Sequence, residues 1–214
     1  YLCVITIMNT FNLKLENGVI LHHSEKKKVR HFLYNTIEEY RVGYHLWKLC
    51  NEPREFVLDV SWEQMLGDFT IGKDSFEYKS NRGALSSGYI SLEVLNTSTV
   101  EPSGLAKSNK DNVDYFLIYL PTYQNYKGKY NHLVDNLLMF RTNELYQWVR
   151  NREELNATNN NFLDSNALCY KVPVRYIEDC ESFNNLIIKK WNLPESELKN
   201  IKIPKELYSL FQDE

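Results

Sequence analysis

The sequence predicts an α/β protein of the α+β kind, in which a mixed central β-sheet is flanked by helices. Short apolar runs bounded by Gly, Pro, Asn and Ser recur along the chain, as is typical of strands. One longer stretch places apolar side chains three and four positions apart, which favours an amphipathic helix. A length of 214 residues suits one domain with a small appended segment. We expect an N-terminal strand or hairpin extension in residues 1–23, a core in 24–155 and a C-terminal α/β extension in 156–214.

The N-terminal half begins with a predicted hairpin followed by a long helix. Phe11 to Leu15 alternates apolar and polar residues, Glu16-Asn-Gly18 favours a turn, and Val19 to Leu21 is a candidate return strand. Ser24 is a good N-cap residue, so the helix is expected from Ser24 to about Cys50. The apolar run Phe56 to Val60 fits either a strand or a second helix, because short apolar runs do not distinguish the two.

The rest of the chain contains further strands and helices. Val113 to Leu120 is the most hydrophobic strand candidate and is expected to lie centrally in the sheet. The other expected strands are Tyr89 to Leu95, Leu137 to Phe140 as the last core strand, and Tyr170 to Ile177. The expected helices are Glu144 to about Leu155, Cys180 to Trp191, and Pro204 to Phe211, and a loop is expected from Ser103 to Lys110.

Composition excludes several classes of protein. A hydrophobic fraction of 43% with 25% charged residues is ordinary for a folded protein, and the net charge of −3 argues against a general polyelectrolyte-binding module. Contacts to nucleic acid must therefore come from local patches. The segment Leu2 to Met8 is apolar but too short to span a bilayer and lacks an export signal, so we expect no membrane association and a cytoplasmic location, in the host cytoplasm for a viral protein.

The four cysteines do not indicate a zinc site or a disulfide framework. Cys3, Cys50, Cys169 and Cys180 are scattered and form no C-x2-C pair. Free cysteines are commonly small buried hydrophobic residues, so we expect inert thiols. The chain also lacks phosphate-binding loop, dinucleotide-binding, zinc-protease and serine-hydrolase motifs.

The segment Gly67 to Asn81 contains the candidate catalytic residues. Asp68 lies nine positions before Glu77, and Lys79 follows two positions later. The intervening Gly72-Lys73-Asp74-Ser75 has the composition of a hairpin loop. If the flanking segments pair as strands, the three polar residues converge, since Glu77 and Lys79 at i and i+2 leave the same face.

These residue types suit hydrolysis of a phosphodiester by a metal ion. Mg²⁺ prefers oxygen ligands and keeps several waters, so Asp68, Glu77 and the backbone carbonyl of Tyr78 are sufficient protein ligands. The metal neutralises the phosphoryl oxygens and acidifies a water for attack. Lys79 is placed to orient that water and to stabilise the charge of the transition state.

This pattern resembles the PD-(D/E)XK nuclease superfamily, with Gly67 in place of the proline. The downstream order also resembles phage-type endonucleases of the superfamily: a glycine-led strand from Gly88 through Glu93, a Ser103-Gly-Leu loop, and an aspartate-led strand from Asp111 to Tyr119. The resemblance covers roughly Asp68 to Trp148. It implies a restriction-endonuclease-like core and a Mg²⁺-dependent deoxyribonuclease, more an endonuclease than an exonuclease, with Mn²⁺ as a substitute for Mg²⁺.

Several features of this function remain open at the level of sequence. Duplex or branched DNA is the expected partner, RNA is not excluded, and a homodimer is an open alternative. The competing function is that of a catalytically inactive nuclease-fold protein that binds nucleic acid or another protein, because a fold alone does not prove activity.

The remaining candidates are additional metal ligands and phosphate contacts. Glu63 and Glu93 are candidates for a further metal ligand, as are Glu38 and Glu39 of the predicted helix, and an exposed glutamate is the alternative for each. Phosphate contacts are expected from basic and hydroxyl side chains, with solvated surface as the alternative. The expected contacts are Lys26, Lys27, Lys28, Arg30, Arg82, Ser103, Lys107 and Lys110. In the segment Tyr123 to His132 the tyrosines Tyr123, Tyr126 and Tyr130 are candidates for stacking on bases and Lys127 and Lys129 for holding phosphates, with an ordinary loop as the alternative.

Overall fold

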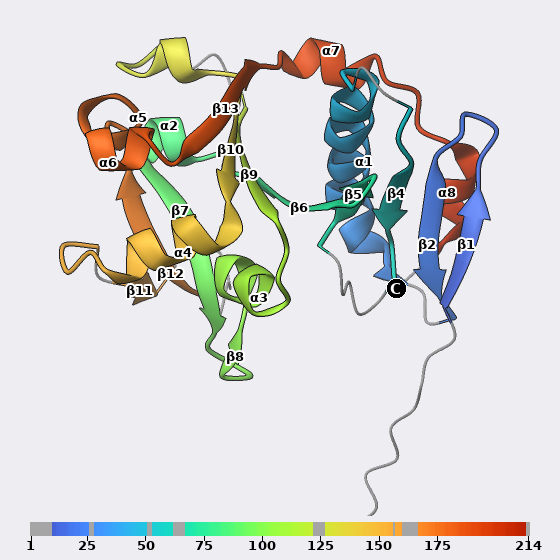
Figure 1. The fold of residues 1–214 in the computed structure, drawn as a ribbon, viewed down its shortest axis with the longest axis horizontal. Coiled ribbons are helices and arrows are strands. Elements are labelled where there is room, and N and C mark those ends of the chain that lie inside the picture. Colours follow the sequence, from blue (N-terminus) through green and yellow to red (C-terminus); the bar gives the residue numbers. More distant parts are fainter. Residues whose placement is uncertain are drawn as a thin grey trace, which may run out of the picture. The chain divides into compact units, whose positions relative to one another are not determined.

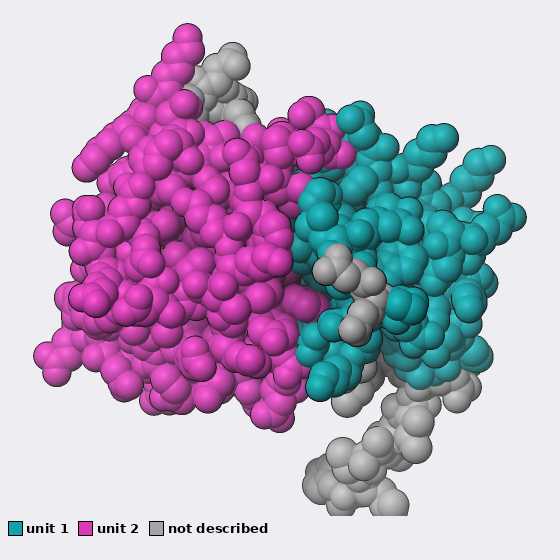
Figure 2. All heavy atoms as spheres, turned by 45° about the horizontal axis from the view of Figure 1, so that its top comes forward, with its two compact units in different colours: residues 1–75, 198–214 teal, residues 76–197 magenta. Residues whose placement is uncertain are grey.

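A computed structural model describes residues 10–25, 28–50, 53–61, 67–121, 127–155, 157–159 and 167–212. The chain divides into two compact units, which Figure 2 distinguishes by colour. Unit 1 comprises residues 1–75 and 198–214, and unit 2 comprises residues 76–197. Both units draw residues from the expected segments 24–155 and 156–214. The apolar segment Leu2 to Met8 lies outside the described residues.

The fold is mixed α/β with a large mixed central sheet flanked by helices, as the sequence predicts (Figure 1). In unit 1 the strand order is β1-β2-β4-β5. The hairpin of β1 and β2 is confirmed and is antiparallel, β2 runs parallel to β4, and β4 runs antiparallel to β5. The bounds are β1 Thr10–Lys14, β2 Ile20–Ser24, β4 Phe56–Asp59 and β5 Phe69–Ile71.

The long helix α1 spans Leu33–Lys48, so its predicted start at Ser24 is wrong. Ser24 instead ends β2 and is buried, and Arg30–Phe32 form a short 3₁₀ turn before the helix. Strand β3, Lys28–Val29, pairs in parallel with β14, Phe211–Gln212. That partner is distant in sequence, so no local pattern reveals it. The basic residues of this segment also disfavour a helix N-terminus.

Helix α1 packs on β4 and β5 through an aromatic cluster. Tyr40, Phe56 and Phe69 are fully buried, and the rings of Phe56 and Phe69 meet edge to face at 5.8 Å. Gly43 allows the helix to approach this closely, because a Cβ there would lie 2.7 Å from the Phe56 ring. The C-terminal residues of unit 1 add helix α8, Lys205–Ser209, where the sequence predicts a helix.

Strand β6, Asp74–Ser80, follows β5 through a tight turn at Gly72-Lys73. Gly72 has φ +64°, in the left-handed region that favours glycine. The expected loop is therefore shortened, and Asp74 and Ser75 already belong to the strand. The unit boundary falls within β6, between Ser75 and Phe76.

Unit 2 contains two sheets. The first has the order β6-β9-β10-β13, with β9 parallel to β6 and antiparallel to β10, so β9 is central as predicted. The second is antiparallel with the order β11-β12-β7-β8. The remaining bounds are β7 Tyr89–Asn96, β8 Glu101–Pro102, β9 Tyr115–Leu120, β10 Asn136–Arg141, β11 Ala157–Asn159, β12 Ala167–Pro173 and β13 Ile187–Asn192.

Several predictions of secondary structure in unit 2 are wrong. The expected strand from Tyr170 to Ile177 is β12, which ends at Pro173, and helix α5, Tyr176–Asp179, follows it. The expected loop from Ser103 to Lys110 forms helix α3, Gly104–Lys110, because Leu105 and Ala106 bury an apolar face. The expected helix from Cys180 to Trp191 is only one turn, α6 Glu181–Asn184, and the chain then extends as β13. Strand β13 pairs with β10, so β10 is not the last strand of the sheet.

The other helices of the chain are short. Helix α4, Thr142–Arg150, begins two residues before the expected Glu144 and ends earlier than predicted. The remaining bounds are α2 Ala84–Ser87, α5 Tyr176–Asp179, α7 Glu195–Lys199 and the 3₁₀ turn Asn131–Leu133. None of the helices in the described ranges combines the length and the apolar character needed to cross a bilayer.

A single apolar core lies between the two sheets of unit 2. Ile90 and Leu92 of β7 and Val172 of β12 are fully buried in one cluster with side chains from β9 and β10. Leu105 of α3 also enters this cluster, as do residues of α4. The core therefore takes up one face of β7, and the alternate residues of that strand face the other way.

Burial of Tyr40 makes unit 1 sensitive to alkaline pH. The side chain is fully buried, its hydroxyl accepts a hydrogen bond from Asn17 Nδ2 at 3.0 Å, and burial raises its pKa from 10.0 to about 12. The native state keeps the phenol proton to a higher pH than the unfolded chain. Its contribution to stability is therefore complete below pH 10 and is lost as the pH rises towards 12.

We expect the substitution Tyr40→Phe to reduce the loss of unfolding free energy between pH 8 and pH 11, because phenylalanine has no proton to lose. The difference from wild type is on the order of 1–3 kcal/mol. Urea unfolding at the two pH values measures it. Tyr208→Phe, at an exposed tyrosine of the same unit, should behave as wild type. An equal alkaline loss in wild type and Tyr40→Phe would contradict the expectation.

Candidate functional site

Glu77 and Lys79 occupy one face of β6. Phe76 and Tyr78 are buried, whereas Glu77 and Lys79 are half-buried, so the predicted alternation along the strand is confirmed. The parallel register places Glu77 beside Phe116 and Lys79 beside Ile118 of β9. Phe116 and Ile118 belong to the core of unit 2. The two polar side chains therefore extend the core-facing side of the sheet.

Lys79 contacts Glu93 of the second sheet. Its Nζ lies 3.8 Å from Glu93 Oε2, with side-chain exposures of 40% and 27%. An ion pair at this exposure contributes little to stability, on the order of 1 kcal/mol or less. Its effect is positional, because it holds the Lys79 ammonium beside β7. Glu93 shares its strand face with Tyr89 and Ser91, opposite the buried Ile90 and Leu92, as predicted.

Asn81 joins the end of β6 to both sheets, and sequence reasoning missed it. Its backbone N–H donates to the carbonyl of Tyr119 at 2.9 Å, and its side-chain Oδ1 accepts from the backbone N–H of Ser91 at 2.9 Å. Asn81 is buried, so these hydrogen bonds are shielded from water. They fix the register in which Lys79 meets Glu93.

Asp68 is buried at the start of β5, in unit 1. Its carbonyl accepts a hydrogen bond at 2.9 Å from the N–H of Asp59, which is also buried. Continuing the register of Leu58 with Phe69 places Asp59 opposite Asp68, on the same face of the antiparallel pair. Asp59 Oδ1 also accepts hydrogen bonds from the backbone N–H and hydroxyl of Ser61, at 2.9 and 2.5 Å.

Asp59 was not among the candidates from sequence. The available signal was a carboxylate inside the apolar run from Phe56 to Val60. A neighbouring pair of carboxylates favours a nearby cation, since like charges opposite each other destabilise a strand pair. Asp68 belongs to unit 1, whereas Glu77 and Lys79 belong to unit 2. The convergence of these three residues therefore stays a prediction.

The further glutamates have different environments. Glu63 lies outside the described residues, Glu39 is buried in α1 and Glu38 is half-buried there. Within the described ranges, no group of three or more His, Cys, Asp and Glu side chains is placed to hold a metal ion.

The expected phosphate contacts within the described ranges are divided between the two units: Lys28 and Arg30 belong to unit 1, and Arg82, Ser103, Lys107 and Lys110 belong to unit 2. Lys28 is buried in β3, whereas Arg30 is exposed. Lys107 lies 3.8 Å from Asp111, and Lys110 is exposed at the end of α3. Ser103 precedes the first residue of α3. Lys26, Lys27, Tyr123 and Tyr126 lie outside the described residues, and Lys127 is exposed.

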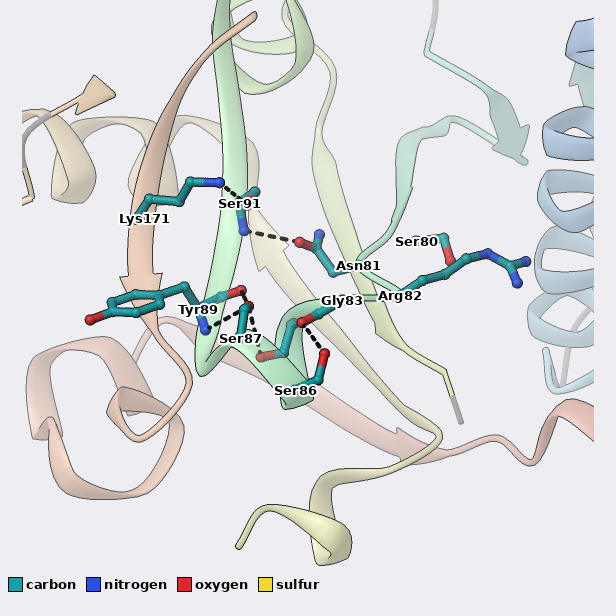
Figure 3. A pocket seen from close by; sticks show the side chains of 10 residues that line it. Ser80, Asn81, Arg82, Gly83, Ser86, Ser87, Tyr89, Ser91 and Lys171 are labelled. Atoms are coloured by element: carbon teal, nitrogen blue, oxygen red, sulfur yellow. Dashed lines mark hydrogen bonds between the residues drawn. The ribbon is translucent and has the colours of Figure 1, made fainter. Parts of the chain in front are cut away.

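Arg82 lines a cavity of about 410 Å³ in unit 2 (Figure 3). The cavity is bounded by the end of β6, helix α2, and strands β7 and β12. Asn81, Ser91 and Lys171 also line it, although none of them was a candidate from sequence. The Arg82 side chain extends away from Lys171, so the two basic groups lie at different ends of the site (Figure 3).

Cys169 of β12 lies on the same face of the second sheet as Glu93, Ser91 and Lys171. It pairs with Glu93 in the register of β12 and β7, and it is buried. Burial raises the pKa of its thiol, and Glu93 raises it further, while Lys171 and Lys79 act in the opposite direction. The thiol therefore stays protonated at neutral pH, as expected for an inert cysteine.

Comparisons of the chain with protein-family models, with curated proteins and with solved structures find no significant match.

We expect Asn81→Ala to weaken the junction between β6 and β7. The substitution removes the acceptor of the Ser91 N–H, which lowers the free energy of unfolding by about 1–2 kcal/mol. Amide hydrogen exchange at Ser91 should accelerate, while exchange at Leu138 of β10 should change less. Asn143→Ala, at an exposed residue of α4, is the control and should leave Ser91 unaffected. Unchanged exchange at Ser91 in Asn81→Ala would contradict this role.

Proposed function

We propose that the protein is a metal-dependent nuclease that hydrolyses phosphodiester bonds in DNA through Asp68, Glu77 and Lys79. The main supporting observation is the half-buried polar face of β6, where Glu77 and Lys79 lie side by side and Lys79 is held 3.8 Å from Glu93. A carboxylate and an ammonium that share one strand face at the margin of an apolar core are candidates for a catalytic site.

The order of elements after β6 also supports the proposal. The resemblance to PD-(D/E)XK nucleases implies a strand with Glu and Lys, then a glycine-led strand, a Ser-Gly-Leu segment and an aspartate-led strand. In this chain β6 is followed by Gly88 and β7, by Ser103 and the first turn of α3, and then by Asp111 and β9. The Ser-Gly-Leu segment begins a helix instead of remaining a loop.

The donor set fits Mg²⁺. This ion prefers oxygen ligands and commonly binds through one or two carboxylates while it keeps several waters. Asp68 and Glu77 supply two carboxylates, and the Tyr78 carbonyl is a further oxygen donor. When bound, the metal would neutralise phosphoryl oxygens and make a water more acidic. Asp59, opposite Asp68, adds negative charge that would favour a cation in unit 1.

In the proposed site the side chains have different roles. Asp68 and Glu77 hold the cation, and Lys79 donates to the attacking water or to a phosphoryl oxygen, where it stabilises developing negative charge. Glu93 fixes the position of the Lys79 ammonium, and its alternative role is that of a further metal ligand.

We expect the purified protein to cleave or nick DNA with Mg²⁺ or Mn²⁺ and to lose activity in EDTA. Glu77→Ala and Lys79→Ala should each lower the rate by at least about 10²-fold, because each removes a group that acts on the transition state. Supercoiled plasmid, linear duplex, single strand, branched DNA and RNA form the substrate panel. Circular dichroism checks that the variants stay folded.

The matched controls are Lys73→Ala and Glu101→Ala, at exposed residues outside the proposed site, which should cleave as wild type does. Cleavage that persists in both Glu77→Ala and Lys79→Ala would eliminate this site. If the wild type cleaves none of the substrates, the alternative of an inactive nuclease fold is favoured. A mobility-shift assay with nucleic acid then tests that alternative.

Glu93→Gln separates the two roles of Glu93. If Glu93 positions Lys79, the rate falls about tenfold while the concentration of Mg²⁺ giving half-maximal activity is unchanged. If Glu93 binds the metal, that concentration rises. Titration of cleavage with Mg²⁺ measures both quantities. A variant with the wild-type rate at every Mg²⁺ concentration would exclude both roles.

A further inference from the structure

The cavity beside Asn81 has the chemistry of a phosphate site. Its lining side chains in the described part of the chain include hydroxyls, an amide and two basic groups, and no carboxylate. A volume of about 410 Å³ lies within the range of sites for small ligands, on the order of 300–1,000 Å³. Hydrogen-bond donors and cations without a competing carboxylate favour an anionic ligand.

Lys171 and Ser91 form the end of the cavity opposite Arg82. These residues pair directly in the register of β12 and β7, so their side chains share a face. Lys171 Nζ donates to Ser91 Oγ at 2.7 Å. A hydroxyl that accepts from an ammonium directs its own hydrogen elsewhere, and a phosphate oxygen beside Lys171 would receive it.

The serines of the cavity differ in how their hydroxyls are used. Ser86 donates to the carbonyl of Gly83, and Ser87 bonds to the carbonyls of Ala84 and Tyr89, so both belong to the local turn (Figure 3). Ser80 differs from them, because its Oγ is buried and has no hydrogen-bond partner among the described residues. A buried hydroxyl in that state is unfavourable, but its oxygen is closed to solvent and therefore belongs to the wall of the cavity instead of to its ligand contacts.

Tyr89 supplies an aromatic surface at the edge of the cavity. It is 48% exposed and shares the β7 face with Ser91. Figure 3 shows its ring and the Lys171 side chain on the same side of β7. An exposed ring beside a phosphate site is suited to stacking a base.

We propose that this cavity binds one unpaired nucleotide of a nucleic-acid strand, with its phosphate in contact with the paired Lys171 and Ser91 side chains and its base against Tyr89. The assignment to a nucleic-acid strand rests on the proposed nuclease function, whereas the phosphate site rests on the cavity alone. Ser91 and Glu93 are same-face neighbours on β7, about 6–7 Å apart along the strand. The cavity therefore holds the nucleotide adjacent to the one whose phosphate meets Lys79.

A concave site of this size selects a single nucleotide instead of a stacked base pair. A duplex would have to unpair a base to enter it, which costs free energy that an unpaired strand avoids. The structure thus assigns the proposed nuclease a substrate with an unpaired segment, either a single strand or the unpaired part of branched DNA.

The experiment measures binding in EDTA, so that cleavage does not enter. Fluorescence anisotropy compares a labelled oligothymidylate with a duplex of the same length, using wild type, Lys171→Ala, Lys171→Arg, Tyr89→Ala and Tyr89→Phe. We expect the single strand to bind at least about fivefold more tightly than the duplex. Lys171→Ala and Tyr89→Ala should each weaken single-strand binding by about tenfold, and Lys171→Arg and Tyr89→Phe should retain most of it.

Lys190→Ala is the matched control, because Lys190 is an exposed lysine on β13 of the same unit. Thymidine monophosphate as competitor distinguishes the two sources of the ligand. If thymidine monophosphate competes at millimolar concentration or below, the phosphate site binds a free nucleotide. If only an unlabelled oligonucleotide competes, the ligand is a nucleic-acid strand. Wild-type affinity in Lys171→Ala, or an equal loss in Lys190→Ala, would overturn the proposal.

The outcome is separable from that of the nuclease assay. Specific binding that depends on Lys171 without any cleavage would leave the nucleotide site in place and remove the catalytic proposal. Cleavage by the wild type together with unchanged binding in Lys171→Ala would leave the catalytic proposal in place and remove the nucleotide site.

Discussion

The candidate site depends on how a polar strand end is held against an apolar core. Asn81 follows β6 and connects it to both sheets of unit 2, through one backbone hydrogen bond to Tyr119 and one side-chain hydrogen bond from Ser91. Without this junction the spacing between β6 and β7 would not be fixed. The contact of Lys79 with Glu93 and the pairing of Ser91 with Lys171 both depend on that spacing.

Strand β7 divides two environments. Ile90 and Leu92 are fully buried between the sheets, whereas Ser91 and Glu93 carry polar groups on the opposite face. The second face is shielded from water at Cys169, because burial raises the pKa of the Cys169 thiol even with Lys171 nearby. Charges placed beside a region of this kind interact more strongly than they would in water. The same strand thus contributes one face to the core and the other to the proposed ligand site.

Secondary structure is predicted correctly from the sequence where the pattern depends on neighbouring residues. The alternation in β7, the apolar run of β9 and the turn of the first hairpin each depend on neighbouring residues, and the structure confirms them. The start of α1 and the existence of β13 depend on distant partners, namely Phe211–Gln212 for β3 and β10 for β13. Local periodicity contains no information about those partners.

The same distinction applies to the site. Glu77, Lys79 and Glu93 lie in motifs that are visible in the sequence, whereas Asp59, Asn81 and Lys171 become relevant only through strand pairing. Asp59 is opposite Asp68, and Lys171 is opposite Ser91, although Lys171 lies 80 residues further along the chain. No spacing rule within the motif would have selected them.

The discontinuity of unit 1 has a consequence for synthesis of the protein. Its first segment ends at Ser75, and its second segment, from Leu198, is made only after all of unit 2. Strand β3 therefore lacks its partner β14 until translation has passed the whole of residues 76–197. Unit 2 is contiguous and can form its core while the chain is still being made, in keeping with folding of domains as units during synthesis. The last part of the fold to close is thus the part that contains Asp68.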